Sequence, residues 1–127
     1  MTEQDWMEIR ERPAGAVAVV DVIGRMVLTE GDGDSLLRDR VTALMTQGHQ
    51  QVVVNLSQVT QVDTSGLKQL LSAHLAITRR GGQLRLANPT RRIRDLLAIT
   101  RLNTLFEVFD TEQAAIESFA SGSNVKT

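Results

Sequence analysis

The segment from residue 52 to residue 71, VVVNLSQVTQVDTSGLKQLL, constrains the fold most because its apolar pattern changes period within it. It opens on apolar, mostly β-branched residues that end at Leu56, which is typical of a buried strand. Polar turn residues follow, and the next apolar residues recur at helical spacing: Leu67, Leu70, Leu71 and Leu75. The segment therefore predicts a central strand, a polar loop and an amphipathic helix.

The junction before this helix holds Asp63, Thr64 and Ser65, residue types that favour a helix N-terminus. Ser65 is expected at or beside the N-cap, where free backbone N–H groups and the positive end of the helix dipole point outward. The ordinary role of such a serine is to cap the helix. The alternative is a phosphorylation switch, because a phosphate at a helix N-terminus can be added without unfolding the domain and would act on a docked partner.

Strands and helices alternate along the rest of the chain. The apolar patterns predict further strands at residues 6–12, 16–23, 83–87 and 105–109. A tight turn at Gly24-Arg25 is expected to lead into a short returning strand at residues 26–28. Helices are predicted at residues 35–47, before Gly48; from Ser65 to Arg79-Arg80, before Gly81-Gly82; at 90–99, capped by Thr90; and up to residue 119, capped by Asp110 or Thr111.

This alternation predicts one α/β domain over residues 1–120, followed by a polar C-terminal tail at residues 121–127. The β-sheet is expected to be mixed and mostly parallel, flanked by about four α-helices.

Composition excludes several classes of function. Aromatic residues are scarce, so the chain lacks the stacking platforms of single-strand nucleic-acid binders. A formal net charge of −1 steers it neither to DNA nor to a membrane, and the absence of cysteine excludes disulfides and thiolate metal sites. No apolar run reaches the length of a membrane span or forms a signal-peptide core. A soluble cytoplasmic protein is expected, with no nucleic-acid partner and no membrane insertion.

An enzymatic role for Ser65 is disfavoured because neither histidine can serve as its base. His74 lies further along the same expected helix, roughly 13 Å away along the axis. His49 precedes the central strand and is expected at the end opposite Ser65. Ser65 lacks the G-x-S-x-G elbow, and no phosphate-binding glycine loop occurs. His74 is expected to be a partly buried core residue, and no cofactor is expected.

Two charged segments each allow two interpretations. The acidic loop EGDGD at residues 30–34 suggests calcium, but it lacks the glycine and the distal glutamate at EF-hand spacing. Solvated acids, with Asp34 or Ser35 capping the next helix, are preferred, and no metal site is predicted.

The second charged segment is rich in arginine: Arg79, Arg80, Arg85, Arg91, Arg92, Arg94 and Arg101. The first interpretation is that Arg79 and Arg80 close a helix and the others line solvated faces. The second is a docking surface for an acidic partner or an anionic lipid, with Arg91, Arg92 and Arg94 as candidates.

In their order along the chain, these motifs resemble the signature of STAS domains, the fold shared by bacterial anti-sigma factor antagonists and the cytoplasmic tails of sulphate transporters. The matching features are the strand VVVNLS, the spacer QVTQV and the motif Asp63-Thr64-Ser65-Gly66-Leu67. Gly24-Arg25, Gly48, Gly81-Gly82, LRLAN at residues 84–88 and LF-x-V-F at residues 105–109 also fit. The resemblance covers residues 9–119, and its one departure within the motif is Thr64, where serine is common.

The resemblance implies that Ser65 matches a serine phosphorylated by an anti-sigma factor of histidine-kinase-like ATPase fold. Asp63 matches the acidic residue that supports this phosphorylation, and Thr64, Gly66 and Leu67 complete the partner-binding motif. The unphosphorylated antagonist binds the anti-sigma factor and frees the sigma factor, and a PPM-type serine phosphatase resets the phosphorylated form. The alternative is a STAS scaffold subunit of a stress-signalling complex or a lipid-transport ATPase complex. Neither role makes the chain an enzyme.

Overall fold

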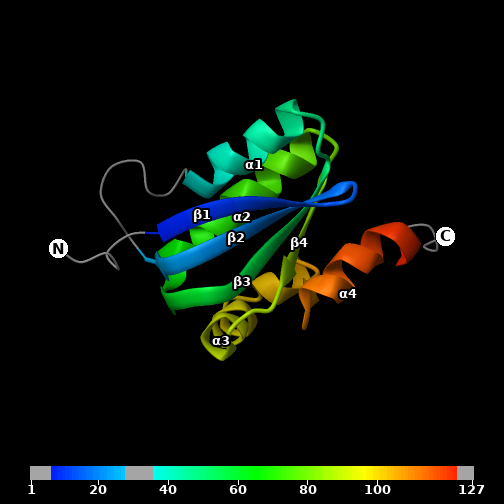
Figure 1. Cartoon of the computed structure of the whole chain (residues 1–127). Coiled ribbons are helices and arrows are strands. Elements are labelled where there is room, and N and C mark those ends of the chain that lie inside the picture. Colours follow the sequence, from blue (N-terminus) through cyan, green and yellow to red (C-terminus); the bar gives the residue numbers. More distant parts are fainter. Residues whose placement is uncertain (1–6, 28–35, 123–127) are drawn as a thin grey trace.

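The computed structural model describes residues 7–27 and 36–122, which form a mixed five-stranded sheet in the order β1-β2-β3-β4-β5. The strands are β1 (Met7–Ala14), β2 (Val17–Met26), β3 (Gln51–Val62), β4 (Gln83–Ala87) and β5 (Val108–Phe109). The helices are α1 (Leu36–Thr46), α2 (Thr64–Arg79), α3 (Arg91–Ile99) and α4 (Glu112–Glu117), with a 3-10 turn at Leu102–Thr104 and a π-turn at Ser118–Gly122. Figure 1 shows α1 and α2 on one side of the sheet and α4 on the other. The predicted α/β architecture is confirmed.

The sheet is antiparallel only between its first two strands. β1 pairs with β2 as a hairpin, whereas β2, β3, β4 and β5 run parallel to one another. Parallel strands bring their carboxyl ends to one edge of the sheet. His49 precedes β3 and Ser65 follows it, so they lie at opposite ends of the central strand.

The central strand is longer than the sequence indicates. A polar loop was expected after Leu56, but β3 continues to Val62 and pairs there with Met26 of β2. Val59 and Val62 are buried, while the polar residues between them are exposed. Both valines belong to one apolar cluster although they are three residues apart, because Thr60 between them is an extra residue in the pairing with β2. The spacer is therefore a strand, which its polar composition concealed.

The turn expected at Gly24-Arg25 and the returning strand at 26–28 are also wrong. β2 runs on through both residues to Met26. Gly24 has a φ of 98°, and the register with β3 shifts just before and after it. Glycine tolerates this conformation, and the extra residues at both register shifts lie in β3, so β2 continues through Gly24 to Met26.

Most of the core lies between the sheet and α1 and α2. On α1, predicted over residues 35–47, Leu37, Val41 and Leu44 form the buried face. On α2 the buried face turns differently from the prediction: Ala73 and Ile77 are buried, and Leu75 is 41% exposed. The apolar residues of α2 thus extend beyond the face that the sheet covers.

A smaller apolar cluster lies on the opposite face of the sheet. Val17, Val19, Val53 and Ala87 contribute from the strands, and Ala115 and Phe119 from α4 and the turn after it. No residue of α4 belongs to the larger cluster among the residues that the structure describes. The C-terminal helix therefore packs separately from the main core.

The two edges of the sheet differ. At the outer edge of β1, the Arg40 guanidinium donates to the backbone carbonyl of Ile9 at 3.2 Å and to Glu11 at 2.8 Å. At the other edge, the strand expected at residues 105–109 shortens to Val108–Phe109. Phe106, before it, is buried in the larger cluster.

Thr111, one of the two residues predicted as the cap of the last helix, caps α4 by accepting a hydrogen bond from the backbone N–H of Ala114 at 3.1 Å.

Candidate functional site

The N-terminus of α2 is capped by Asp63. The Asp63 carboxylate oxygen Oδ1 accepts a hydrogen bond from the backbone N–H of Gly66 at 2.8 Å. Ser65 lies beside the cap, as the second residue of the helix, and is half-buried. Its hydroxyl has no hydrogen-bond partner within residues 7–27 and 36–122. Capping is thus the work of Asp63, which leaves the Ser65 hydroxyl available for other chemistry.

Gly66 fixes this helix end against strand β2. A Cβ atom added to Gly66 would lie 1.7 Å from the carbonyl oxygen of Met26. The backbone N–H of Asp63 donates to the same oxygen at 3.3 Å. The glycine of the motif is therefore required by a close approach of two backbones, and it holds Ser65 at the carboxyl edge of the sheet.

Replacing Asp63 separates its capping role from its charge. We expect Asp63→Ala to lower the free energy of unfolding by about 1 kcal/mol, because the N–H of Gly66 loses its acceptor. Asp63→Asn keeps a capping oxygen and should stay close to the wild type in stability. Urea unfolding of both variants measures this difference, with Thr64→Ala as a control that removes an exposed side chain. Equal losses in Asp63→Ala and Asp63→Asn would contradict a capping role.

The other two residues of the motif have different environments. Thr64 is exposed in the first turn of α2 and is available to a partner. Leu67 is 2% exposed and belongs to the larger apolar cluster. It was predicted as a partner-binding residue, and its position instead anchors the helix that presents Ser65.

The arginine segment divides into structural and surface residues. Arg85 was expected on a solvated face or a docking surface, but it is 7% exposed. Its guanidinium donates to the hydroxyl of Ser118, lies 4.1 Å from the centre of the Phe119 ring and pairs with Glu107 at 3.4 Å. Arg85 therefore holds the C-terminal segment. The sequence did not reveal this role, because Arg85 faces away from the main core and the residues that cover it, Ser118 and Phe119, come much later in the chain.

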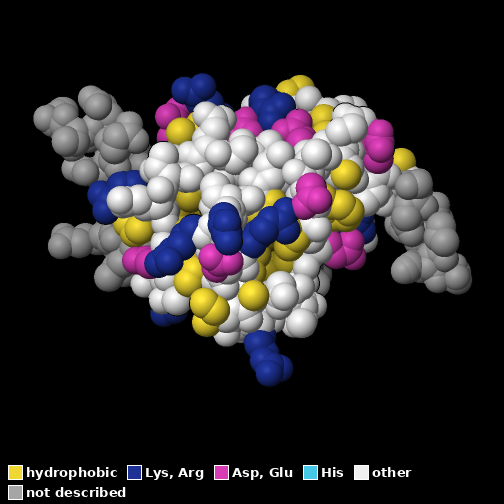
Figure 2. Space-filling model, turned by 90° about the horizontal axis from the view of Figure 1, so that it is seen from below, with side chains coloured by type: hydrophobic (Ala, Val, Ile, Leu, Met, Phe, Trp, Pro, Cys, Tyr) yellow, Lys and Arg dark blue, Asp and Glu magenta, His cyan; other side chains and the backbone are white. Residues whose placement is uncertain are grey.

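The candidate docking arginines lie on α3. Arg94 pairs with Asp110, whereas Arg91 and Arg92 are exposed and have no ion-pair partner in the part of the chain that the structure describes. Figure 2, which views the molecule from the side of α3 and α4, shows basic side chains interleaved with acidic ones. Such interleaving lowers the net field over this face and leaves Arg91 and Arg92 as its candidate contacts for an acidic group.

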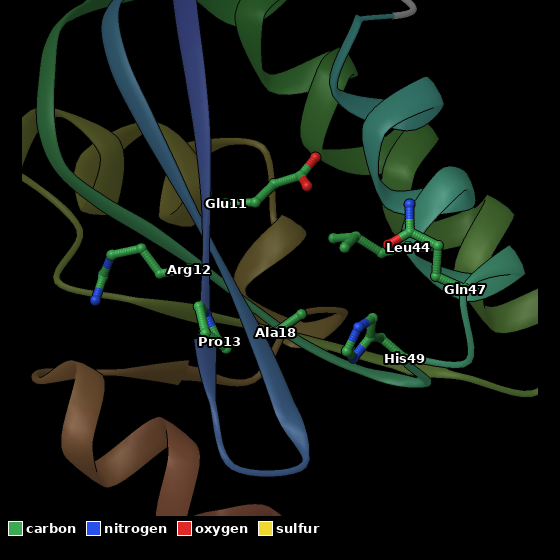
Figure 3. A pocket seen from close by; sticks show the side chains of 7 residues that line it. All are labelled: Glu11, Arg12, Pro13, Ala18, Leu44, Gln47 and His49. Carbon is green, nitrogen blue, oxygen red and sulfur yellow. The ribbon is translucent and has the colours of Figure 1, made fainter.

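Neither histidine serves Ser65. His74 is half-buried, as expected, and its ring meets Phe106 edge-on at 5.1 Å between centroids. Burial lowers the pKa of His74 below its ordinary value, which favours the neutral ring. His49 lines a hollow of about 200 Å³ between the β1–β2 hairpin and the end of α1 (Figure 3). This hollow lies at the opposite end of β3 from Ser65.

Two further observations concern metal binding and membrane-spanning helices among the described residues. They contain no group of three or more His, Cys, Asp or Glu side chains that could hold a metal ion. The acidic loop at residues 30–34, for which a calcium interpretation was weighed, lies outside them. Among the helices of the described segments, none has the length and apolarity that crossing a membrane requires.

Comparison with known proteins gives the family. A model described as the STAS domain matches residues 16–115. The chain belongs to the STAS domain family. A Thermotoga neapolitana protein named as an anti-sigma factor antagonist is 26% identical to this STAS domain over 73 residues, covering 58% of this chain and 65% of that protein. A Thermotoga maritima protein with the same description is 25% identical over the same share of each chain. The match spans 65% of these relatives' length, which is less than two thirds.

Solved structures share the fold of this STAS domain. A crystal structure from Thermotoga maritima, described as an anti-sigma factor antagonist, superposes with a TM-score of 0.74 at 19% identity, covering 87% of this chain and 92% of that one. The unphosphorylated form of the anti-sigma factor antagonist SpoIIAA gives a TM-score of 0.66 at 17% identity, over 90% and 99% of the two chains. The phosphorylated form of SpoIIAA from Bacillus gives 0.65 at 18% identity, over 88% and 99%. At these identities the likeness shows the fold.

Proposed function

We propose that this STAS domain is an anti-sigma factor antagonist switched by phosphorylation of Ser65. The unphosphorylated form binds an anti-sigma factor, which is a serine kinase of histidine-kinase-like ATPase fold, and thereby releases a sigma factor. Phosphorylation ends the binding, and a PPM-type serine phosphatase restores it. In this proposal the chain is a cytoplasmic binding protein without a cofactor, and the kinase activity belongs to its partner.

The observation that carries the proposal is that Asp63, and not Ser65, caps the N-terminus of α2. Asp63 caps the helix, and Ser65 beside it is half-buried, with a hydroxyl that has no partner among the described residues. A phosphate on that hydroxyl would lie at the positive end of the helix dipole, where it costs the fold little. The cap would remain in place because Ser65 does not form it.

The charge of the phosphate explains why a partner would leave. Phosphorylation adds about two negative charges beside the Asp63 carboxylate. A partner docked over this helix end would have to desolvate both groups or meet them with its own positive charge. Unphosphorylated Ser65 demands neither, so binding depends on the modification state.

The first test is the intact mass of the protein recovered from its native cells, during growth and under stress, with the modified residue mapped. We expect a single phosphate on Ser65 whose occupancy changes with the condition. Mapping in the same spectra should find the neighbouring Thr64 unmodified. A protein that stays unmodified in every condition would favour the alternative of a scaffold subunit in a stress-signalling or lipid-transport ATPase complex. Co-purifying subunits would then identify that complex.

A further inference from the structure

A cluster of charged and polar side chains joins the C-terminal helix to the sheet. The Arg12 guanidinium of β1 donates to both carboxylate oxygens of Asp21, at 2.6 and 2.9 Å. It also donates to both carboxylate oxygens of Glu112, the first residue of α4, at 2.6 and 3.2 Å. Arg12 therefore forms a bridge between an acidic group of the sheet and an acidic group of the helix, and we call this bridge the Arg12 clamp.

The Glu112 carboxylate has a second anchor on the sheet. The side-chain amide of Asn55 in β3 donates to Glu112 Oε1 at 2.7 Å. Hydrogen bonding to Arg12 is the largest cause of a lowered pKa of Glu112, so its charged form is favoured. Asp21 and Asn55 are buried on the sheet, and their burial fixes the positions of the groups that hold Arg12 and Glu112.

The direction of Arg12 separates it from the main core. Figure 3 shows the neighbouring side chains Glu11 and Arg12 leaving β1 toward opposite sides, with Glu11 on the side of α1. Glu11 pairs with Arg40 of α1, and Arg12 pairs with Glu112 of α4. Because side chains alternate between the two faces of a strand, Glu11 pairs with a helix on one face of the sheet and Arg12 with a helix on the other.

The apolar contribution of α4 is small. The helix has six residues, and only Ala115 within it is buried. Phe119 and the half-buried Ile116 add to its contact with Val17, Val19, Val53 and Ala87 on the sheet. Because the larger cluster contains no residue of α4, loss of this contact would leave the main core packed.

We propose that α4 is a reversible lid, held on the sheet by the Arg12 clamp together with the contacts of Arg85 to Ser118 and Phe119, and that it opens without unfolding the rest of the domain. Opening uncovers an apolar strip formed by Val17, Val19, Val53 and Ala87. The clamp is partly exposed, with 46% of the Arg12 side chain and 25% of the Glu112 side chain accessible. Dissolved salt therefore weakens the closed state by screening these charges.

The test is residue-resolved amide hydrogen exchange on the full chain carrying Glu112→Gln. This change keeps the shape and an acceptor for Asn55 but removes the charge that Arg12 binds. Amides of α4 are expected to exchange about tenfold faster, the effect of losing one charge-assisted hydrogen bond, while those of β3 and α2 keep their wild-type rates. The matched control is Glu8→Gln, which removes a carboxylate paired with Arg10 on the same strand at 2.8 Å. It should leave α4 unchanged.

Two results would overturn the lid. In the first, Glu112→Gln accelerates amide exchange of α4 and of the core by the same factor. The clamp then stabilises the whole domain, and α4 does not open separately. In the second, α4 keeps its wild-type rates. If Glu112→Gln does not fold, the wild-type protein at rising salt gives the same answer. A lid requires faster exchange of α4 at salt concentrations where the amides of β3 are still protected, and exchange of both in step would overturn it.

Discussion

Gly66→Ala is expected to lower the free energy of unfolding by about 3 kcal/mol or more, at the upper end of the cost of overpacking a close contact. The added Cβ would lie 1.7 Å from the carbonyl oxygen of Met26 and 2.5 Å from its carbonyl carbon. Both are backbone atoms of β2, so no side chain can turn aside to make room. Relief requires α2 to move away from the sheet, which separates the apolar contacts of Leu67 and Leu70. Chemical denaturation measures the loss.

Gly48→Ala is the matched control for this substitution. Gly48 also has a special backbone conformation, with a φ of 101°, but nothing lies within 4 Å of the position of its missing Cβ. Its replacement should cost about 1 kcal/mol through backbone strain alone. Equal losses in the two variants would show that steric contact with Met26 is not what requires glycine in the motif.

Under the proposed function, Ser65→Asp is expected to weaken binding to the anti-sigma factor at least about a hundredfold, which corresponds to about 3 kcal/mol. The new carboxylate lies beside Asp63 and imitates part of the charge of a phosphate. Stability should stay close to the wild type, because an acidic residue is favourable in the first turn of a helix. Titration calorimetry with the purified partner measures binding, and urea unfolding checks the fold.

Two controls make the Ser65→Asp result specific. Ser65→Ala should keep binding and lose phosphorylation, which shows that the hydroxyl is needed as an acceptor of phosphate. Thr64→Asp adds the same charge one residue earlier, at an exposed position. If Thr64→Asp weakens binding as much as Ser65→Asp, the loss comes from general charge repulsion at this surface, and the result would contradict a switch specific to Ser65. If Ser65→Asp binds like the wild type, the scaffold alternative is supported.

The sequence predicted best those elements whose determinants are local. β4 spans residues 83–87 as expected, and Thr90 caps α3 by accepting from the N–H of Ile93 at 3.3 Å. In both cases the deciding residues lie within a few positions of the element. The family motif and the place of Ser65 at a helix N-terminus were also accessible, because strand, spacer and helix are consecutive in the chain.

The errors have a common physical cause, which is that partners distant in sequence decide the local structure. Gly24 resembles a turn residue, but pairing of β2 with β3 carries the strand through it. The spacer before Asp63 is polar, yet the same pairing makes it a strand. The Arg12 clamp joins residues one hundred positions apart, and no pattern within either segment indicates it.

The contact of Arg40 with the Ile9 carbonyl limits how far the sheet can grow. An edge strand of eight residues offers unpaired backbone groups to any extended chain that meets it. Here a guanidinium already occupies one carbonyl, Pro13 brings no N–H, and charged side chains from Glu8 to Arg12 line the rest. A strand from another molecule would have to displace Arg40 and bury those charges. The edge formed by β1 thus protects concentrated protein from association by strand addition.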